Sequence, residues 1–305
     1  MDFTLYSSTL RDGAWVNLTD RGKWTLSGTD RVRYLNGQVT QDVRLANAES
    51  ALHACVTNAK GRMEGDVFLH STAECLWLDA APGLRETLGL RLERYIIADD
   101  AVLEDVSGAW QLWHWIGGDH KASAEPAVEL GEGGRRLKAQ RFGRPGYDIW
   151  LPAGHALEPT SRTLIAEQAE AFRILQQVPA WPTEIHAEAF PQEAGLEKSC
   201  MSFTKGCYIG QEVLSRIKTT GRMPRELIAW EQIVPANQLP PEGKLFLEER
   251  EIGQITSAVL HPETKRWVGL AYVRQGMAAS DSVLRLGDAL PSVSSQIIIS
   301  AFLNQ

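Results

Sequence analysis

The sequence predicts an α+β protein in two parts, with antiparallel sheets and helices over residues 1–224 and a small β-barrel over residues 225–305. In the first part, short runs of β-favouring residues alternate with stretches whose apolar residues recur at helical spacing. After Pro224 the pattern changes to short strands separated by turns that contain Pro and Gly, as is typical of a small barrel. A chain of 305 residues is long enough for two domains, each with its own core.

The elements of the first part follow from local patterns. A helix that carries Val32 and Leu35 is expected after Ser27 or Asp30, with Gly37 as its end. Two more helices are expected at 82–95 and 161–177, and Pro179 stops the second. Strands are expected at 51–57, 66–71, 75–79, 96–97, 102–103, 110–116 and 147–151.

In the second part, strands are expected at 227–230, 244–247, 253–256 and 267–273, with a hairpin tip at 261–264. Residues 117–134 are polar and rich in glycine, which indicates a surface loop. The basic residues that follow, from Arg135 to Arg144, are interpreted as a solvated loop.

Composition limits the function classes. The net charge of −7 argues against a general nucleic-acid-binding surface, which needs basic density. The four cysteines form no CxxC pair, so neither a disulfide framework nor a metal site is expected, although Cys200 and Cys207 could face one another. No signal pattern or membrane-length apolar run is visible. We therefore expect a reduced, cytoplasmic protein of unknown oligomeric state.

The most unusual segment is Lys205–Glu212, which reads KGCYIGQE. Glycine is needed where φ is positive or where another group approaches the backbone, so Gly206 and Gly210 predict a shaped turn. A thiol just before a helix, with Lys205 two residues away, favours the thiolate. In the alternative interpretation, the glycines only shape a turn and Cys207 is a small buried hydrophobic residue.

The segment KGCYIGQE, preceded by FPQE at 190–193 and followed by Arg216 and by Gly-Arg at 221–222, resembles the YgfZ family. That family is the folate-binding relative of the glycine-cleavage T-protein, an aminomethyltransferase, and has a mitochondrial iron–sulfur assembly counterpart. Residues 26–43 resemble the N-terminal helix and loop of the superfamily, and NAKGR at 58–62 resembles its turn near the folate. The order and spacing fit over nearly the whole chain.

The resemblance implies a fold of three subdomains around a central channel that holds tetrahydrofolate or a one-carbon derivative. Two departures argue against aminomethyl transfer. Gly65-Asp66 replaces the Asp-Asp pair of the enzymes, and Leu175 stands where their glutamate contacts the pterin. A leucine cannot accept hydrogen bonds from the pterin, and an unpaired buried donor costs about 1–3 kcal/mol.

The candidate site residues follow from the motif and the resemblance. Cys207 is the candidate for the chemistry, as nucleophile, redox group or transient ligand, and Lys205 would favour its thiolate. Candidates for folate binding are Asp66 for proton management, Glu193 as a substitute pterin acceptor, Tyr208 for ring contact, Gln211 for a polar contact and Arg216 for the glutamate tail.

These observations predict a tetrahydrofolate-binding accessory protein that supports iron–sulfur cluster assembly or repair through transient contacts with client proteins. An effect on tRNA modification would be indirect, through a cluster-containing enzyme. Two alternatives stay open: a folate-dependent aminomethyl or one-carbon transferase, and a non-catalytic interaction module with a degenerate channel.

Overall fold

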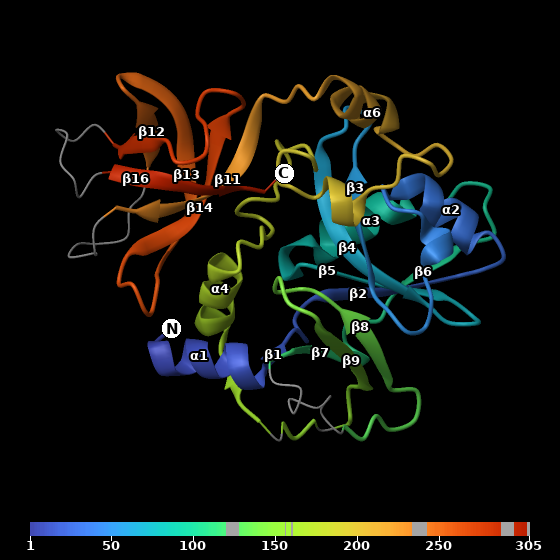
Figure 1. Ribbon diagram of the computed structural model, residues 1–305. Coiled ribbons are helices and arrows are strands. Elements are labelled where there is room, and N and C mark those ends of the chain that lie inside the picture. The colour runs from blue at the N-terminus through green and yellow to red at the C-terminus, as the bar shows by residue number, and fades with distance from the viewer. Residues whose placement is uncertain (120–127, 156, 160, 234–242, 288–295, 304–305) are drawn as a thin grey trace.

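The computed structural model describes residues 1–119, 128–155, 157–159, 161–233, 243–287 and 296–303. Two five-stranded sheets and a closed six-stranded barrel make up the molecule, which confirms the predicted α+β fold and the C-terminal barrel (Figure 1). Part of the predicted surface loop, residues 120–127, lies outside the described residues. None of the described helices is long and apolar enough to cross a membrane.

The first sheet is antiparallel and has the strand order β3-β4-β5-β2-β6. Its strands are β2 (Gly22–Ser27), β3 (Leu52–Thr57), β4 (Met63–Ser71), β5 (Leu76–Ala80) and β6 (Val102–Asp105). The segments that accompany it are α2 (Arg31–Gln38), η1 (Val43–Leu45), η2 (Pro82–Leu84) and α3 (Arg85–Glu93). Buried leucines from both helices and the sheet, such as Leu35, Leu69 and Leu88, form one continuous core.

The second sheet has the order β10-β1-β7-β9-β8. It consists of β1 (Ala14–Asn17), β7 (Trp110–Ile116), β8 (Arg135–Ala139), β9 (Gly146–Pro152) and β10 (Thr163–Leu164). Two helices, α1 (Phe3–Asp12) and α4 (Ala166–Leu175), share a core with it that includes Leu5, Ile116 and Phe172. The helix α1 was not predicted, because more than half of its residues are Ser, Thr or charged, and only Leu5 and Thr9 are buried on it.

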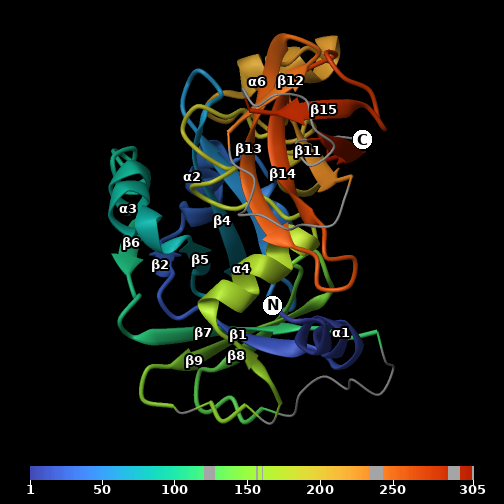
Figure 2. The same cartoon turned by 90° about the vertical axis from the view of Figure 1, so that its left-hand side faces the viewer.

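The barrel closes in the order β11-β14-β13-β12-β15-β16. Its strands are β11 (Arg225–Gln232), β12 (Lys244–Leu247), β13 (Arg250–Leu260), β14 (Trp267–Arg274), β15 (Val283–Leu286) and β16 (Gln296–Phe302). Inward residues such as Ile228, Leu245 and Ile297 fill it. Helix α4 contacts β13 and β14 and lies between the barrel and the second sheet (Figure 2). Helix α4 therefore packs against both the barrel and the second sheet.

Several predicted boundaries are wrong. The helix expected at 161–177 begins at Ala166, because Thr163 and Leu164 pair in parallel with β1. Residues 96–97 form no strand. Helix α2 runs through Gly37 to Gln38, so Gly37 does not end it.

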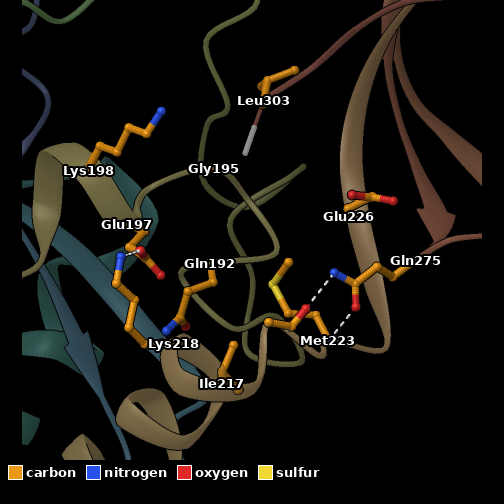
Figure 3. A pocket seen from close by; sticks show the side chains of 11 residues that line it. Gln192, Gly195, Glu197, Lys198, Ile217, Lys218, Met223, Glu226, Gln275 and Leu303 are labelled. Carbon is orange, nitrogen blue, oxygen red and sulfur yellow. Dashed lines mark hydrogen bonds and ion pairs between the residues drawn. The ribbon is translucent and has the colours of Figure 1, made fainter. Parts of the chain in front are cut away.

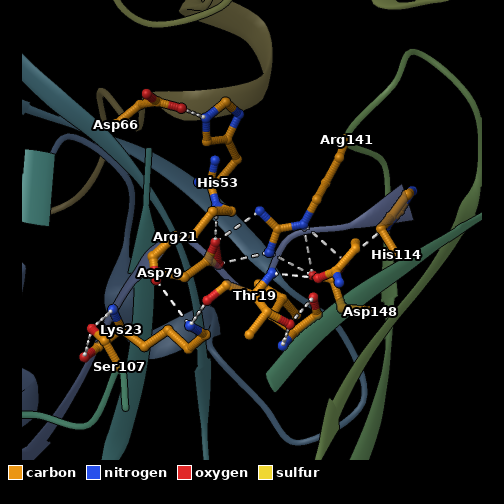
Figure 4. A network of polar contacts seen from close by, with 12 residues as sticks. Thr19, Arg21, Lys23, His53, Asp66, Asp79, Ser107, His114, Arg141 and Asp148 are labelled. Atoms are coloured by element: carbon orange, nitrogen blue, oxygen red, sulfur yellow. Dashed lines mark hydrogen bonds and ion pairs between the residues drawn. The ribbon is translucent and has the colours of Figure 1, made fainter. Parts of the chain in front are cut away.

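The interpretation of the basic cluster as a solvated loop is also wrong. Arg135 lies in β8, and Arg141 is buried between the two sheets (Figure 4). The Arg141 guanidinium pairs with Asp79 of β5 at 2.6 Å and with Asp148 of β9 at 2.7 Å. Nδ1 of His114 donates a further hydrogen bond to the Asp148 carboxylate at 2.8 Å. These ion pairs and hydrogen bonds connect the first sheet to the second.

Candidate functional site

The three segments that resemble the YgfZ superfamily meet in space. The loop 205–212 lies against the end of α2 and the turn that joins β3 to β4. The Ile209 amide donates to the Gly37 carbonyl at 3.1 Å, and the Thr57 hydroxyl donates to the Ile209 carbonyl at 2.7 Å. Residues far apart in the chain thus define a single region of the molecule.

Gly210 is required by the way the loop packs. It has φ +89° and precedes α6 (Gln211–Thr220). A Cβ atom there would lie 2.6 Å from the Asn58 carbonyl oxygen and 2.8 Å from the Thr57 hydroxyl. Gly206 has no positive φ, and no atom within 4 Å would meet a Cβ there. The expected need for glycine is therefore confirmed at Gly210 alone.

The described hydrogen bonds of the Lys205 ammonium are to backbone carbonyl groups. Its buried ammonium donates to the carbonyl oxygens of Val39 and Gln41, each at 2.7 Å, and lies 4.9 Å from the ring centre of Tyr208. Burial lowers the pKa of Lys205 to about 7. We expected this ammonium to favour the thiolate of Cys207. Its described contacts fasten the loop to the residues that follow α2, and its effect on Cys207 stays a prediction.

Tyr208 and Cys207 point to different environments. The Tyr208 ring is buried against Phe190, Met201 and Leu214, and burial raises its pKa to about 12. The Tyr208 hydroxyl is buried without a hydrogen-bond partner, and its contact with a planar ligand ring stays a prediction. Cys207 is exposed. The alternative of a buried, inert Cys207 is therefore contradicted, and the loop presents a thiol to solvent.

The two other residues expected from the motif flank this thiol on α6. Gln211 is half-buried at the first position of the helix, where its amide donates to the Tyr208 carbonyl at 3.2 Å. Arg216 is exposed one turn further on. The structure gives both side chains a place on the surface near the loop, and their role in ligand binding stays a prediction.

Glu193 is fully buried beneath the loop region. Its Oε2 accepts from the Phe190 amide at 2.9 Å and lies 3.4 Å from Nε of Arg225 and 3.7 Å from the Arg62 guanidinium. Its Oε1 is buried without a hydrogen-bond partner. Burial raises the pKa of Glu193 despite the two arginines. A buried acceptor oxygen without a hydrogen-bond partner is uncommon, because most buried polar atoms in folded proteins have one.

Asp66 belongs to a cluster that the sequence did not reveal. Its carboxylate lies 2.8 Å from Nε2 of His53, and Nδ1 of the same ring lies 3.0 Å from Sγ of Cys200 (Figure 4 shows the Asp66–His53 pair). His53 also stacks on Phe68 with ring centres 4.1 Å apart. Cys200 is buried here and Cys207 is exposed, so the two thiols do not face one another.

No spacing in the sequence could have found this cluster, because 147 residues separate His53 from Cys200. Strand β3 supplies the histidine, β4 the aspartate and the short helix α5 (Glu197–Cys200) the thiol. Within the described ranges, no group of His, Cys, Asp and Glu has the arrangement of a metal site.

A pocket of about 370 Å³ lies between α6, the segment 192–198 and the barrel (Figure 3). Lys198, Lys218, Glu197 and Glu226 give it polar walls, and Ile217, Met223 and Leu303 give it apolar ones. A shallower groove of about 680 Å³ lies along β8 and β9. None of the residues predicted from the sequence as site residues lines either hollow.

Comparison with known proteins agrees with this geometry. No family model matches the chain. The fold superposes on the glycine cleavage system aminomethyltransferase T from Bartonella henselae with a TM-score of 0.83, covering 98% of this chain and 88% of that one at 17% identity. This likeness establishes the fold alone.

The tRNA-modifying protein YgfZ of Yersinia pestis strain Pestoides F is 30% identical over 298 residues, which cover 90% of this chain and 88% of the relative. The chain belongs to the YgfZ family. An iron-sulfur cluster assembly factor IBA57 homologue, mitochondrial, from Pyricularia oryzae is 28% identical over 263 residues. That match covers 81% of this YgfZ-family chain but only 63% of the relative's length.

Proposed function

We propose that this YgfZ-family chain is a tetrahydrofolate-binding accessory protein that supports assembly or repair of iron–sulfur clusters in other enzymes. The observation that carries the proposal is the exposed thiol of Cys207, held on a loop that Lys205 and Gly210 fasten to two other segments. The names of the YgfZ and IBA57 relatives support it. Its effect on tRNA modification is indirect, through a cluster-containing modifying enzyme.

The proposal includes the surroundings of that activity. Client iron–sulfur proteins bind transiently, in the cytoplasm, where four free cysteines remain reduced. The net charge of −7 gives no general affinity for nucleic acid, so the chain acts on enzymes rather than on tRNA itself. The folate binds to the first part of the chain, residues 1–224. The barrel, residues 225–305, supports that part.

The residues present fit a pterin ring in one respect. A pterin presents N–H and NH2 donors, and Oε1 of Glu193 is a buried acceptor without a partner. Glu193 thereby replaces the acceptor that is missing at Leu175, and Asp66 provides a second carboxylate. A bound reduced folate supplies a carrier for one-carbon units. We expect no aminomethyl transfer, because the Asp-Asp pair and the pterin-binding glutamate of the enzymes are absent.

Replacing Cys207 with serine is expected to abolish rescue of iron–sulfur enzyme activity in a bacterial strain that lacks its own YgfZ. Serine keeps the size of the side chain but cannot act as a thiolate at neutral pH. The matched control is Cys75→Ser, since Cys75 is a half-exposed free cysteine on another part of the chain. Full rescue by Cys207→Ser at wild-type protein level would end the proposed role of this thiol.

Titration calorimetry with tetrahydrofolate and 5-formyl-tetrahydrofolate tests the cofactor. We expect saturable binding to the wild type, and a Kd at least about tenfold higher for Glu193→Gln, because one hydrogen bond to a charged group contributes about 1.5–3 kcal/mol. The control is Glu188→Gln, an exposed glutamate nearby. Absence of wild-type binding at millimolar ligand contradicts the folate assignment, and equal binding by Glu193→Gln contradicts the role of Glu193.

A further inference from the structure

A second thiol lies beside Cys200. Cys55, on β3, is also buried and packs with Cys200 in one cluster of buried residues. Thr40 joins their backbones, because its hydroxyl accepts from the Cys55 amide at 2.9 Å and donates to the Cys200 carbonyl at 2.5 Å. Two cysteines distant in the sequence are therefore held together by side-chain and backbone contacts.

The two thiols are in different states. Burial by itself raises the pKa of Cys200, but the hydrogen bond from Cys55 and the imidazolium of His53 outweigh it, so the pKa is lowered. Burial and the neighbouring sulfur raise the pKa of Cys55 well above its ordinary value. Cys200 is accordingly the thiolate and Cys55 the thiol that donates to it.

His53 is held in its charged form. Burial alone would lower its pKa, but the Cys200 sulfur and the Asp66 carboxylate raise it to about 10. Asp66 stays ionised, because its bond to His53, together with Arg21 and Arg141, overcomes the effect of burial on its pKa. The arrangement of carboxylate, imidazolium and thiolate is that of an activated nucleophile.

We propose that Cys200 and Cys55 form a redox-active pair in which Cys200, hydrogen-bonded to His53, reacts with small hydroperoxides and Cys55 then closes a disulfide with it. Neither sequence comparison nor the proposed iron–sulfur function assigns these residues. The activity does not depend on Cys207 or on folate, so it can be tested on the purified protein by itself.

The chemistry balances in two steps. The Cys200 thiolate attacks the terminal oxygen of the O–O bond, so sulfenic acid forms and the alkoxide leaves with the proton of Nδ1 of His53. The Cys55 sulfur then attacks the sulfenic sulfur, and the departing hydroxide takes the Cys55 proton to form water. One hydroperoxide is reduced to an alcohol and water while two thiols become one disulfide.

The surroundings select a small oxidant. Sγ of Cys200 is buried, whereas the His53 side chain is 20% exposed and the exposed Ser199 places its hydroxyl 3.2 Å from the sulfur. A sulfur buried behind these two residues suits a small oxidant better than a bulky acyl or peptide substrate. Hydrogen peroxide is the matching probe.

The test uses a Cys75→Ser, Cys207→Ser background, in which Cys55 and Cys200 are the remaining cysteines. One equivalent of hydrogen peroxide at about pH 6 should remove two thiols at least about tenfold faster than it oxidises free cysteine, since the ionised fraction is larger and outweighs the lower nucleophilicity. Peptide mass spectrometry should show a 55–200 disulfide. Oxidation no faster than that of free cysteine, or without this linkage, overturns the proposal.

Two further variants separate chemistry from folding. With Cys55→Ser in the same background, the sulfenic acid cannot close a disulfide, so peptide mass spectrometry should show one added oxygen atom on Cys200. With His53→Gln, the reaction should become slow near pH 6 and rise only toward the ordinary thiol pKa of about 8.5, whereas His155→Gln should keep the wild-type profile. An unchanged pH profile for folded His53→Gln overturns the role of the imidazolium.

Discussion

Replacing Arg141 with methionine is expected to lower the free energy of unfolding by about 3–5 kcal/mol, because it leaves two buried carboxylates without their shared cation. The guanidinium forms bonds of 2.6–3.0 Å to Asp79 and Asp148, which belong to different sheets. Each carboxylate keeps one partner in the variant: Arg21 pairs with Asp79 at 2.7 Å and His114 with Asp148 at 2.8 Å. The free energy of unfolding therefore falls by less than it would if both carboxylates lost every partner. Urea unfolding measures the change.

The control for this prediction is Arg136→Met, which removes an exposed arginine from β8 and should change stability by at most about 0.5 kcal/mol. The pH dependence supplies an independent check. The native pKa of Asp148 lies far below its ordinary value, so the wild type loses this stabilisation as the pH falls below about 4. In the Arg141 variant the two carboxylates have lost their shared cation and take up protons more readily, so the difference in stability should shrink in acid. A difference that grows in acid would contradict the assignment.

Gly210→Ala is expected to displace the loop 205–212 and to cost about 2–4 kcal/mol. An alanine at φ +89° is strained by about 1–2 kcal/mol, and its Cβ would lie 2.6 Å from a backbone oxygen, so the turn at Asn58 or the start of α6 must move. Hydrogen–deuterium exchange should rise in the loop, above all at the Ile209 amide, which donates to the Gly37 carbonyl. Rescue of iron–sulfur enzyme activity should fall with it.

Gly206→Ala is the matched control, since Gly206 lies in the same loop, next to Cys207. Its backbone has no positive φ, and no atom lies within 4 Å of the added Cβ, so stability should change by at most about 0.5 kcal/mol. Equal losses for the two variants would show that the loop is sensitive to any side chain, and would contradict the argument from Gly210.

Local patterns predicted much of the fold. Runs of β-favouring residues between turn residues predicted strands such as β3, β7 and β14, and also the change to a barrel after Pro224. These patterns depend only on residues that are neighbours in the sequence. The loop 205–212 was found for the same reason, since its unusual residues are contiguous. The largely polar α1 and the two-residue β10 were missed, because their packing against other elements specifies them.

The chemistry of the interior could not be read in this way. His53, Asp66 and Cys200 come from three elements, and only the packing of α5 on β3 brings the thiol to the ring. In the sequence, Arg141 belongs to a run of basic residues that is typical of a surface. In the folded protein the two sheets enclose it between the carboxylates of Asp79 and Asp148. The position of Lys205 in the sequence likewise indicates an interaction with Cys207. In the structure its ammonium donates to the carbonyl oxygens of Val39 and Gln41, which follow α2.

The most direct test of the proposed function is replacement of a YgfZ protein by this chain in a bacterial strain that lacks its own. The account predicts that the wild-type chain restores the activity of iron–sulfur enzymes and, with it, the level of a tRNA modification made by a cluster-containing enzyme. If the chain accumulates in folded form and restores neither, its assignment to iron–sulfur cluster assembly is contradicted.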